Sequence, residues 1–106
     1  MKILPLKIKR ITPSLKLINL LNTNNSHLLS VYKINDDLNV IITVDGPEKI
    51  YHLSISHQER YPTYDEIKSI KYTFFPDRHL VMHFPSDKDY VNIHANCFHL
   101  FELSCA

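Results

Sequence analysis

Three runs rich in β-forming residues, separated by short polar segments, constrain the fold more than any other feature of this sequence. The runs span residues 28–34, 38–44 and 49–56. The segments between them, 35–37 and 45–48, consist of asparagine, aspartate, glycine, proline and glutamate, which is a composition typical of turns. Because connections this short join neighbouring antiparallel strands, the sequence predicts a β-meander.

The strongest helix signal follows the third run. Thr63 and Glu66 are spaced as in a capping box, in which the threonine hydroxyl and the glutamate carboxylate bind amides at the helix start. Pro76 should end the helix, which we therefore expect over about residues 63–75. The residues expected on the face that packs on the sheet are Tyr64, Ile67, Ile70 and Phe74.

Weaker patterns complete the predicted fold. We expect strands over 2–11, 79–84 and 97–103, a polar turn over 22–26 and a loop over 85–89. Residues 13–21 suit a short helix that opens at Pro13, although a strand is also compatible with so short a run. The predicted class is α+β: a curved antiparallel sheet of five to seven strands with one main helix packed on it and a second short helix near 13–21.

Length and composition indicate a single domain over residues 1–106, because 106 residues with 44% hydrophobic content can bury one core. No apolar run approaches the roughly eighteen residues of a membrane span. Lys7, Lys9 and Arg10 interrupt the apolar residues near the start, unlike a signal peptide. We therefore expect a cytoplasmic protein, no membrane partner, and Cys97 and Cys105 as reduced thiols.

Glycine content and charge distribution narrow the function classes. Gly46 is the only glycine, so the chain cannot form the glycine-rich loops of P-loop or dinucleotide-binding proteins. The net charge is only +1, but basic residues precede the first acidic residue, Asp36. This basic arm could contact phosphate or an acidic partner. Its predicted contact residues are Lys7, Lys9, Arg10 and Lys16.

A first group of candidate binding residues lies on the third run. His52, Ser54 and Ser56 should share one face of a strand, since side chains alternate. A histidine and a serine two positions apart can bind phosphate, and phosphoesterases with two histidine motifs use two such strands. This chain has one good copy of the motif. The alternative is a solvated strand face.

A second group lies near the C-terminal end. Tyr90, Asn92 and His94 alternate in the same way, and the Asn92 amide could read a base edge, a ribose or a peptide backbone. Alternatively, Asn92 and His94 tie down a long connection. Arg60 could project toward the face of His52 and bind a phosphate or a carboxylate through two parallel hydrogen bonds. Alternatively, it could form an ion pair with Glu59 or Asp65.

His94 and His99 have a spacing seen for paired zinc ligands, with Cys97 between them and His52 or Asp89 as further candidates. No Cys-x-x-Cys or His-Glu-x-x-His motif accompanies them, so neither a metal nor another cofactor is expected. No residue has a sequence context that specifies a catalytic role.

Taken together, these motifs resemble a family of small uncharacterised proteins found mainly in bacteriophage genomes. The resemblance covers about residues 50–102, and Phe101 stands where the family usually has tryptophan. It implies a phage or prophage origin and no assigned activity. The matching residues are His52, Ser54, Ser56, Arg60, Pro62, Thr63, Glu66, Pro85, Tyr90, Val91, Asn92, His94, His99, Leu100 and Phe101.

Three functions are compatible with the sequence. The first is a small phage-type binding protein that acts by occupancy, inhibits a host defence system or another host factor, and is not an enzyme. The second is a nucleotide sponge or histidine-based phosphoesterase, and the third a nucleic-acid-binding module that uses the basic arm. Exposed edge strands would also permit a homodimer. The predicted ligand- or partner-binding residues are His52, Ser54, Ser56, Arg60, Tyr90, Asn92, His94 and His99.

Overall fold

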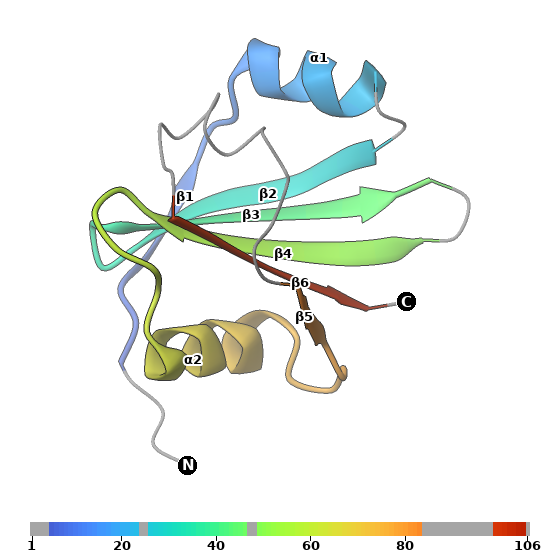
Figure 1. Cartoon of the computed structure of the whole chain (residues 1–106). Coiled ribbons are helices and arrows are strands. Elements are labelled where there is room, and N and C mark those ends of the chain that lie inside the picture. Colours follow the sequence, from blue (N-terminus) through green and yellow to red (C-terminus); the bar gives the residue numbers. More distant parts are fainter. Residues whose placement is uncertain (1–4, 24–25, 47–48, 84–98, 106) are drawn as a thin grey trace.

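One antiparallel sheet with a helix on each face makes up the described part of the chain (Figure 1). The computed structural model describes residues 5–23, 26–46, 49–83 and 99–105. Within them, six strands are ordered β1-β2-β3-β4-β6-β5, which confirms the predicted α+β class. The strands are β1 (Ile8–Ile11), β2 (Ser26–Ile34), β3 (Leu38–Asp45), β4 (Ile50–His57), β5 (Val81–His83) and β6 (His99–Cys105), and the helices are α1 (Leu15–Thr23) and α2 (Tyr64–Phe74).

Strands β2, β3 and β4 form the predicted three-stranded meander, and β1 is added at its edge beside β2. The β2–β3 turn contains Asn35 and Asp36, both in the left-handed region with φ of 54° and 65°. Asparagine and aspartate tolerate this conformation better than most residues, which explains why the turn forms at this point. The Asn35 side chain also accepts a hydrogen bond from the Lys7 backbone amide at 2.8 Å, so the turn holds the chain just before β1.

The second half of the sheet departs from simple sequence order. After β4, the chain passes through α2 and enters the sheet at β5, and β6 then fills the place between β4 and β5. Because β6 is antiparallel to both neighbours, β4 and β5 run in the same direction. The predicted strand over 79–84 begins at Val81, and the predicted final strand over 97–103 is present from His99 and continues to Cys105; residues 84, 97 and 98 lie outside the described residues. The predicted loop over 85–89 lies outside the described residues.

The larger core lies between α2 and the sheet. The capping box is present as predicted, with Thr63 as N-cap and Glu66 as its reciprocal partner. Tyr64 is an exception to the predicted packing face, because it is 65% exposed. Three residues of a helix turn about 300°, which is about 60° short of a full turn. Tyr64, which is two such steps before Ile70, therefore lies about 120° from it around the helix axis. Buried members of this core are Ile34, Leu38, Val40, Ile42, Leu53, Ile55, Ile67, Ile70, Leu80 and Leu103.

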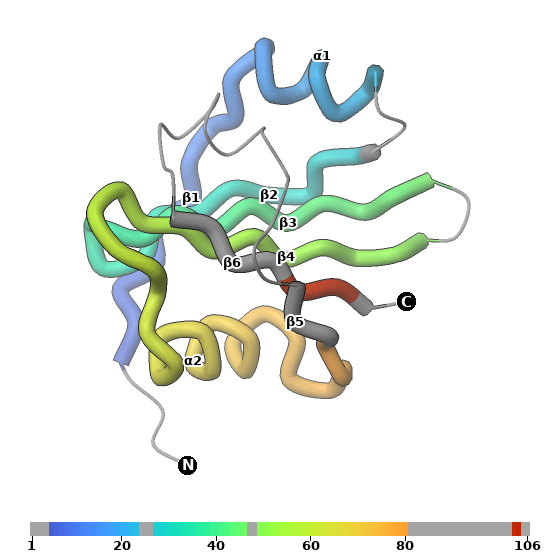
Figure 2. The backbone as a smooth tube through the Cα atoms, in the orientation of Figure 1, coloured from blue at the N-terminus to red at the C-terminus, as the bar shows by residue number. Residues whose placement is uncertain are grey.

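A smaller core lies between α1 and the opposite face of the sheet (Figure 2). Leu17 and Leu21 pack there against Val31 and Ile41. Residues 13–21 are therefore mainly helical, and the helix continues to Thr23, into the segment predicted as a turn. Ser14 caps this helix, since its hydroxyl accepts a hydrogen bond from the Leu17 amide at 3.2 Å.

Candidate functional site

The first predicted group of polar residues shares one face of β4, as expected from alternation. His52, Ser54 and Ser56 face the same side of the sheet as α1, and their register partners on β3 include Ile41 and Thr43. They are not solvated, however: their exposed fractions are 9%, 1% and 1%. The expectation of a solvated strand face is therefore wrong, and these residues form a buried polar row.

His52 is held by an acidic partner within this row. Its Nε2 lies 2.7 Å from Asp45 Oδ2, where the ring nitrogen must donate because the carboxylate only accepts. The His52 side chain is buried, whereas Asp45 at the end of β3 reaches solvent. This contact ties the end of β3 to β4 and gives His52 a structural partner.

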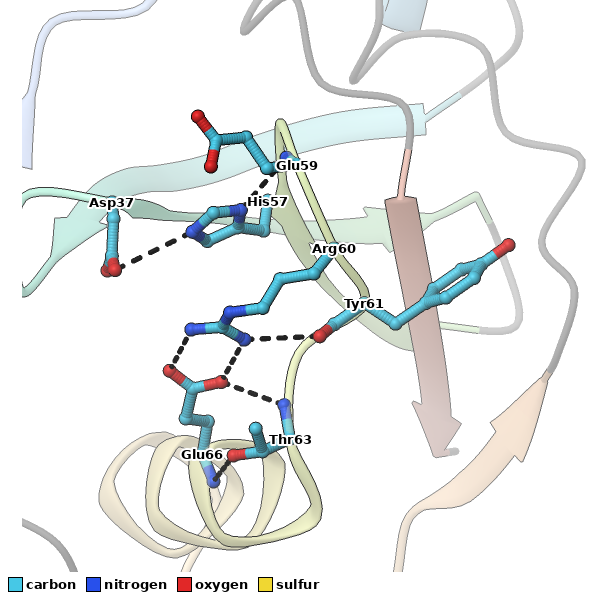
Figure 3. Close-up of polar contacts among 7 residues, drawn as sticks. All are labelled: Asp37, His57, Glu59, Arg60, Tyr61, Thr63 and Glu66. Carbon is cyan, nitrogen blue, oxygen red and sulfur yellow. Dashed lines mark hydrogen bonds and ion pairs between the residues drawn. The ribbon is translucent and has the colours of Figure 1, made fainter.

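Arg60 lies on the other side of the sheet, with α2 (Figure 3). Its guanidinium donates to both carboxylate oxygens of Glu66, at 2.7 and 3.0 Å, and to the carbonyl of Tyr61 at 3.1 Å. The prediction that Arg60 projects toward the face of His52 is therefore wrong. As predicted, Arg60 binds a carboxylate with two hydrogen bonds. The carboxylate belongs to Glu66 and not to Glu59 or Asp65. The capping box turns Glu66 back toward the loop, which brings its carboxylate within reach of Arg60.

The Arg60–Glu66 pair is partly shielded and has a large electrostatic effect. The two hydrogen bonds from Arg60 lower the pKa of Glu66 from 4.5 to about 2, assisted by bonds from Thr63. The same contact raises the pKa of Arg60. The Glu66 side chain is 12% exposed and that of Arg60 is 42% exposed, so solvent screens one end of the pair. These contacts make the loop from β4 to α2 a rigid support.

His57 was not among the predicted site residues, yet it borders a pocket of about 330 Å³ at the corner between the β2–β3 turn and the end of β4. Its Nδ1 accepts a hydrogen bond from the Glu59 amide at 3.0 Å, which assigns the ring proton of the neutral imidazole to Nε2. That nitrogen faces Asp37 Oδ2 at 3.6 Å (Figure 3). In the sequence, the signal for a site at His57 was its position at the end of a strand, followed by polar residues. Lys33, Asp36, Asp37, Asn39, Gln58 and Glu59 also line this pocket.

The second predicted group lies mostly outside the described residues. Tyr90, Asn92 and His94 belong to the segment 84–98, and Cys97 and Asp89 lie there as well. His99 begins β6, where the backbone register pairs it with His57. The binding roles of Tyr90, Asn92 and His94 therefore stay predictions.

The basic residues form a folded surface rather than a loose arm. Lys7 precedes β1, Lys9 and Arg10 lie on this edge strand, Lys16 lies on α1, and all four are exposed. Lys33 was not among the predicted contact residues, but the register places it opposite Lys9 on the same face of the β1–β2 pair. The charge distribution offered a signal for it, since the first 34 residues contain six of the twelve basic residues and none of the eleven acidic ones. We call the unit of β1, α1 and β2 the basic edge.

One member of the basic edge has an acidic neighbour. Lys7 Nζ lies 3.5 Å from Asp36 Oδ2, and both side chains are more than 70% exposed. Lys9, Arg10, Lys16 and Lys33 make no ion pair with the other residues that the structure describes. Two lysines directly opposite on paired strands repel each other, so the Lys9–Lys33 pair lowers rather than raises stability. The basic edge therefore presents positive charge that the described part of the fold leaves available.

Neither helix of the described structure has the length and apolar character needed to cross a membrane. Comparison with curated proteins and with solved structures finds no match to this chain. A protein-family model does match, over residues 41–104, which begins within β3 and includes β4, α2 and the Arg60–Glu66 contact. Since this match spans more than half of the chain, the protein belongs to the family described as a domain of unknown function, DUF7694.

Proposed function

We propose that this protein is a small binding module that acts by occupancy, and that the basic edge is its contact surface for an acidic protein. The observation that carries the proposal is the charge segregation: residues 5–34 contain five basic residues and no acidic residue, while all eleven acidic residues follow. A surface of one sign attracts a partner of opposite sign and speeds its encounter. The Lys9–Lys33 repulsion would be relieved by such a partner, which gives the arrangement a functional reason.

Apolar side chains on the same surface favour a protein over a nucleic acid. Leu15 and Leu29 are 77% and 46% exposed, and both belong to the basic edge, whereas Ile8 lies opposite Ile34 on the α2 face. Nucleic-acid surfaces commonly stack bases on aromatic rings. Tyr32 is the one aromatic residue of the basic edge, and its ring packs against Phe74 on the α2 face. Basic groups around exposed aliphatic groups match the polar rim and apolar centre of a protein interface.

The structure gives less support to a nucleotide-binding or phosphoesterase function. The buried position of His52, Ser54 and Ser56 leaves little access for a phosphate, and Arg60 is occupied by Glu66. The resemblance to bacteriophage proteins supports a partner in the host cytoplasm, such as a component of a defence system. Binding would then inhibit that partner by covering its surface.

Two triple variants with the same loss of charge test this function. The first, Lys9→Gln/Lys16→Gln/Lys33→Gln, neutralises the basic edge, and the second, Lys49→Gln/Lys68→Gln/Lys71→Gln, neutralises three lysines elsewhere. The wild-type protein and both variants are used to isolate partners from host cytosol, and binding to each purified partner is measured at several salt concentrations. We expect an acidic protein whose affinity falls at least tenfold with the first variant and less than threefold with the second.

Two results would contradict the proposal. Equal losses with the two variants would show that position on the basic edge does not matter. Binding of DNA or RNA with a steep salt dependence, in the absence of any protein partner, would favour the nucleic-acid-binding function instead.

A further inference from the structure

A pocket of about 280 Å³ lies within the basic edge, between α1 and the β1–β2 pair. Ile11, Ile18, Leu28 and Val31 provide apolar walls. The β2–β3 register shifts between Leu28 and Ser30, so the strand bulges at the site where it lines the pocket. The volume lies just below the range of about 300–1,000 Å³ that is typical of sites for whole small molecules, which suits a single inserted side chain.

Polar residues also line this pocket. They include Arg10, Asn22 and His27, and all three are exposed. By strand alternation the Arg10 side chain lies on the α2 face with Tyr32, so Arg10 borders the pocket from the β1 strand without placing its guanidinium on the α1 side. The pocket therefore combines an apolar interior with a polar rim, within a surface whose exposed lysines supply the positive charge.

We propose that this pocket is the anchor site of the basic edge: it takes one aliphatic or aromatic side chain of an acidic protein segment, while neighbouring carboxylates of that segment pair with the exposed lysines of the basic edge. This inference rests on the proposed function and specifies the partner's chemistry. Binding energy in protein interfaces concentrates in a few apolar anchors that fill pockets inside a polar rim. The positive charge of the surrounding surface favours acidic residues on both sides of the anchor.

Two capped peptides of identical charge test the anchor. The first has leucine between two glutamates on each side, and the second has alanine in place of the leucine. Titration of the isotope-labelled protein, followed by nuclear magnetic resonance, gives both the affinity and the position of binding. We expect the leucine peptide to shift the amides of Ile11, Ile18 and Leu28 and to bind at least tenfold more tightly than the alanine peptide.

Protein variants separate the pocket from the general charge of the surface. Ile18→Asp places a carboxylate in the pocket, whereas Asn19→Asp places the same charge on α1 at an exposed residue that does not line it. We expect about a tenfold loss of leucine-peptide affinity from the first and less than threefold from the second. Because Ile18→Asp could unfold α1, the variant Lys9→Gln/Lys16→Gln/Lys33→Gln provides a second test: it should weaken the binding of both peptides and leave the preference for leucine over alanine unchanged.

The outcomes distinguish the anchor from the proposed function. Equal affinities for the leucine and alanine peptides would overturn the anchor, even if both peptides bound the basic edge and so supported its role. Binding of the leucine peptide away from the pocket, or no binding at millimolar concentration, would also overturn it. The proposed function itself is tested separately, by the two triple lysine variants and by the search for nucleic-acid binding.

Discussion

The two faces of the sheet differ in both packing and polarity. Among the described residues, the face toward α2 buries ten apolar residues in one cluster, and its helix starts with a complete capping box that is bound by Arg60. Within the same part of the chain, the face toward α1 buries four residues in its apolar cluster and also contains the buried polar row of His52, Ser54 and Ser56. The α1 helix has a serine cap, but no acidic residue in its first turn and no basic residue in its last.

This difference indicates a division of roles. An extensive apolar core and a well-capped helix stabilise the fold, and both belong to the α2 face. The α1 face carries the basic edge and its pocket, whose charge pattern costs stability and is more easily explained by binding. Four predictions test this division, beginning with the largest expected effect.

Truncation of matched core residues should show which face stabilises the protein more. Ile70 and Leu17 both have 0% exposure, on α2 and α1 respectively. We expect Ile70→Ala to lower the free energy of unfolding by about 3–4 kcal/mol and Leu17→Ala by about 2–3 kcal/mol. Urea denaturation measures both values. A larger loss from Leu17→Ala would reverse the proposed division.

The two histidine–aspartate contacts provide a second comparison. His52 and Asp45 are within hydrogen-bond distance at 2.7 Å, whereas His57 and Asp37 are 3.6 Å apart. We expect Asp45→Ala to destabilise the protein by about 1.5–2.5 kcal/mol, because it removes the hydrogen-bond partner of the buried His52 Nε2. Asp37→Ala should cost less than about 1 kcal/mol, since the His57 ring keeps its bond from the Glu59 amide. Thermal unfolding of both variants at pH 7 tests this order.

The Arg60–Glu66 contact on the α2 face should make the free energy of unfolding depend on pH in the acidic range. Because folding lowers the pKa of Glu66 from 4.5 to about 2, its contribution is complete above pH 4.5 and is lost as the pH falls toward 2. Glu66→Gln retains a residue compatible with the capping box, so we expect a loss of about 1 kcal/mol at pH 7 after allowance for solvent screening.

Chemical denaturation between pH 2 and pH 7 measures this effect. The difference between wild type and Glu66→Gln should shrink toward zero at the acid end. Asp65→Asn, one position away in the same helical turn, serves as the control and should leave the wild-type pH dependence unchanged. A constant difference across the whole range would show that the charge of Glu66 is not responsible.

The smallest effect should be a gain in stability on the α1 face. The Ser56 hydroxyl is buried and has no hydrogen-bond partner among the described residues. Ser56→Ala removes this group at little cost in volume, so we expect the free energy of unfolding to rise by about 0.5–1 kcal/mol. A decrease of similar size would indicate that the hydroxyl has a partner in the folded protein.

Local sequence signals predicted the elements well because each depends on a few adjacent residues. The segment 35–37 formed the expected turn, and Thr63 and Glu66 formed the expected capping box. Relations between distant segments were harder to predict. Nothing near β4 in the sequence indicates that β6 will be its neighbour, and Arg60 had several acidic residues within reach of its long side chain.

The candidate site was predicted only in part for the same reason. Alternation placed His52, Ser54 and Ser56 on one face, but their burial depends on what the folded chain packs over them. The basic residues were recognised individually, whereas the pairing of Lys9 with Lys33 follows from the β1–β2 register. The pocket beside Arg10 depends on a bulge and on the position of α1, neither of which has a distinct sequence signal.

The insertion of β6 between β4 and β5 has a consequence for biosynthesis. While the nascent chain emerges from the ribosome, β5 is made before its only described neighbour, and β4 has an open edge until residues 99–105 follow. Unpaired strand edges promote association between chains. A translation product interrupted before residue 99 should therefore aggregate or be degraded, so that cells accumulate this protein only with its final strand in place.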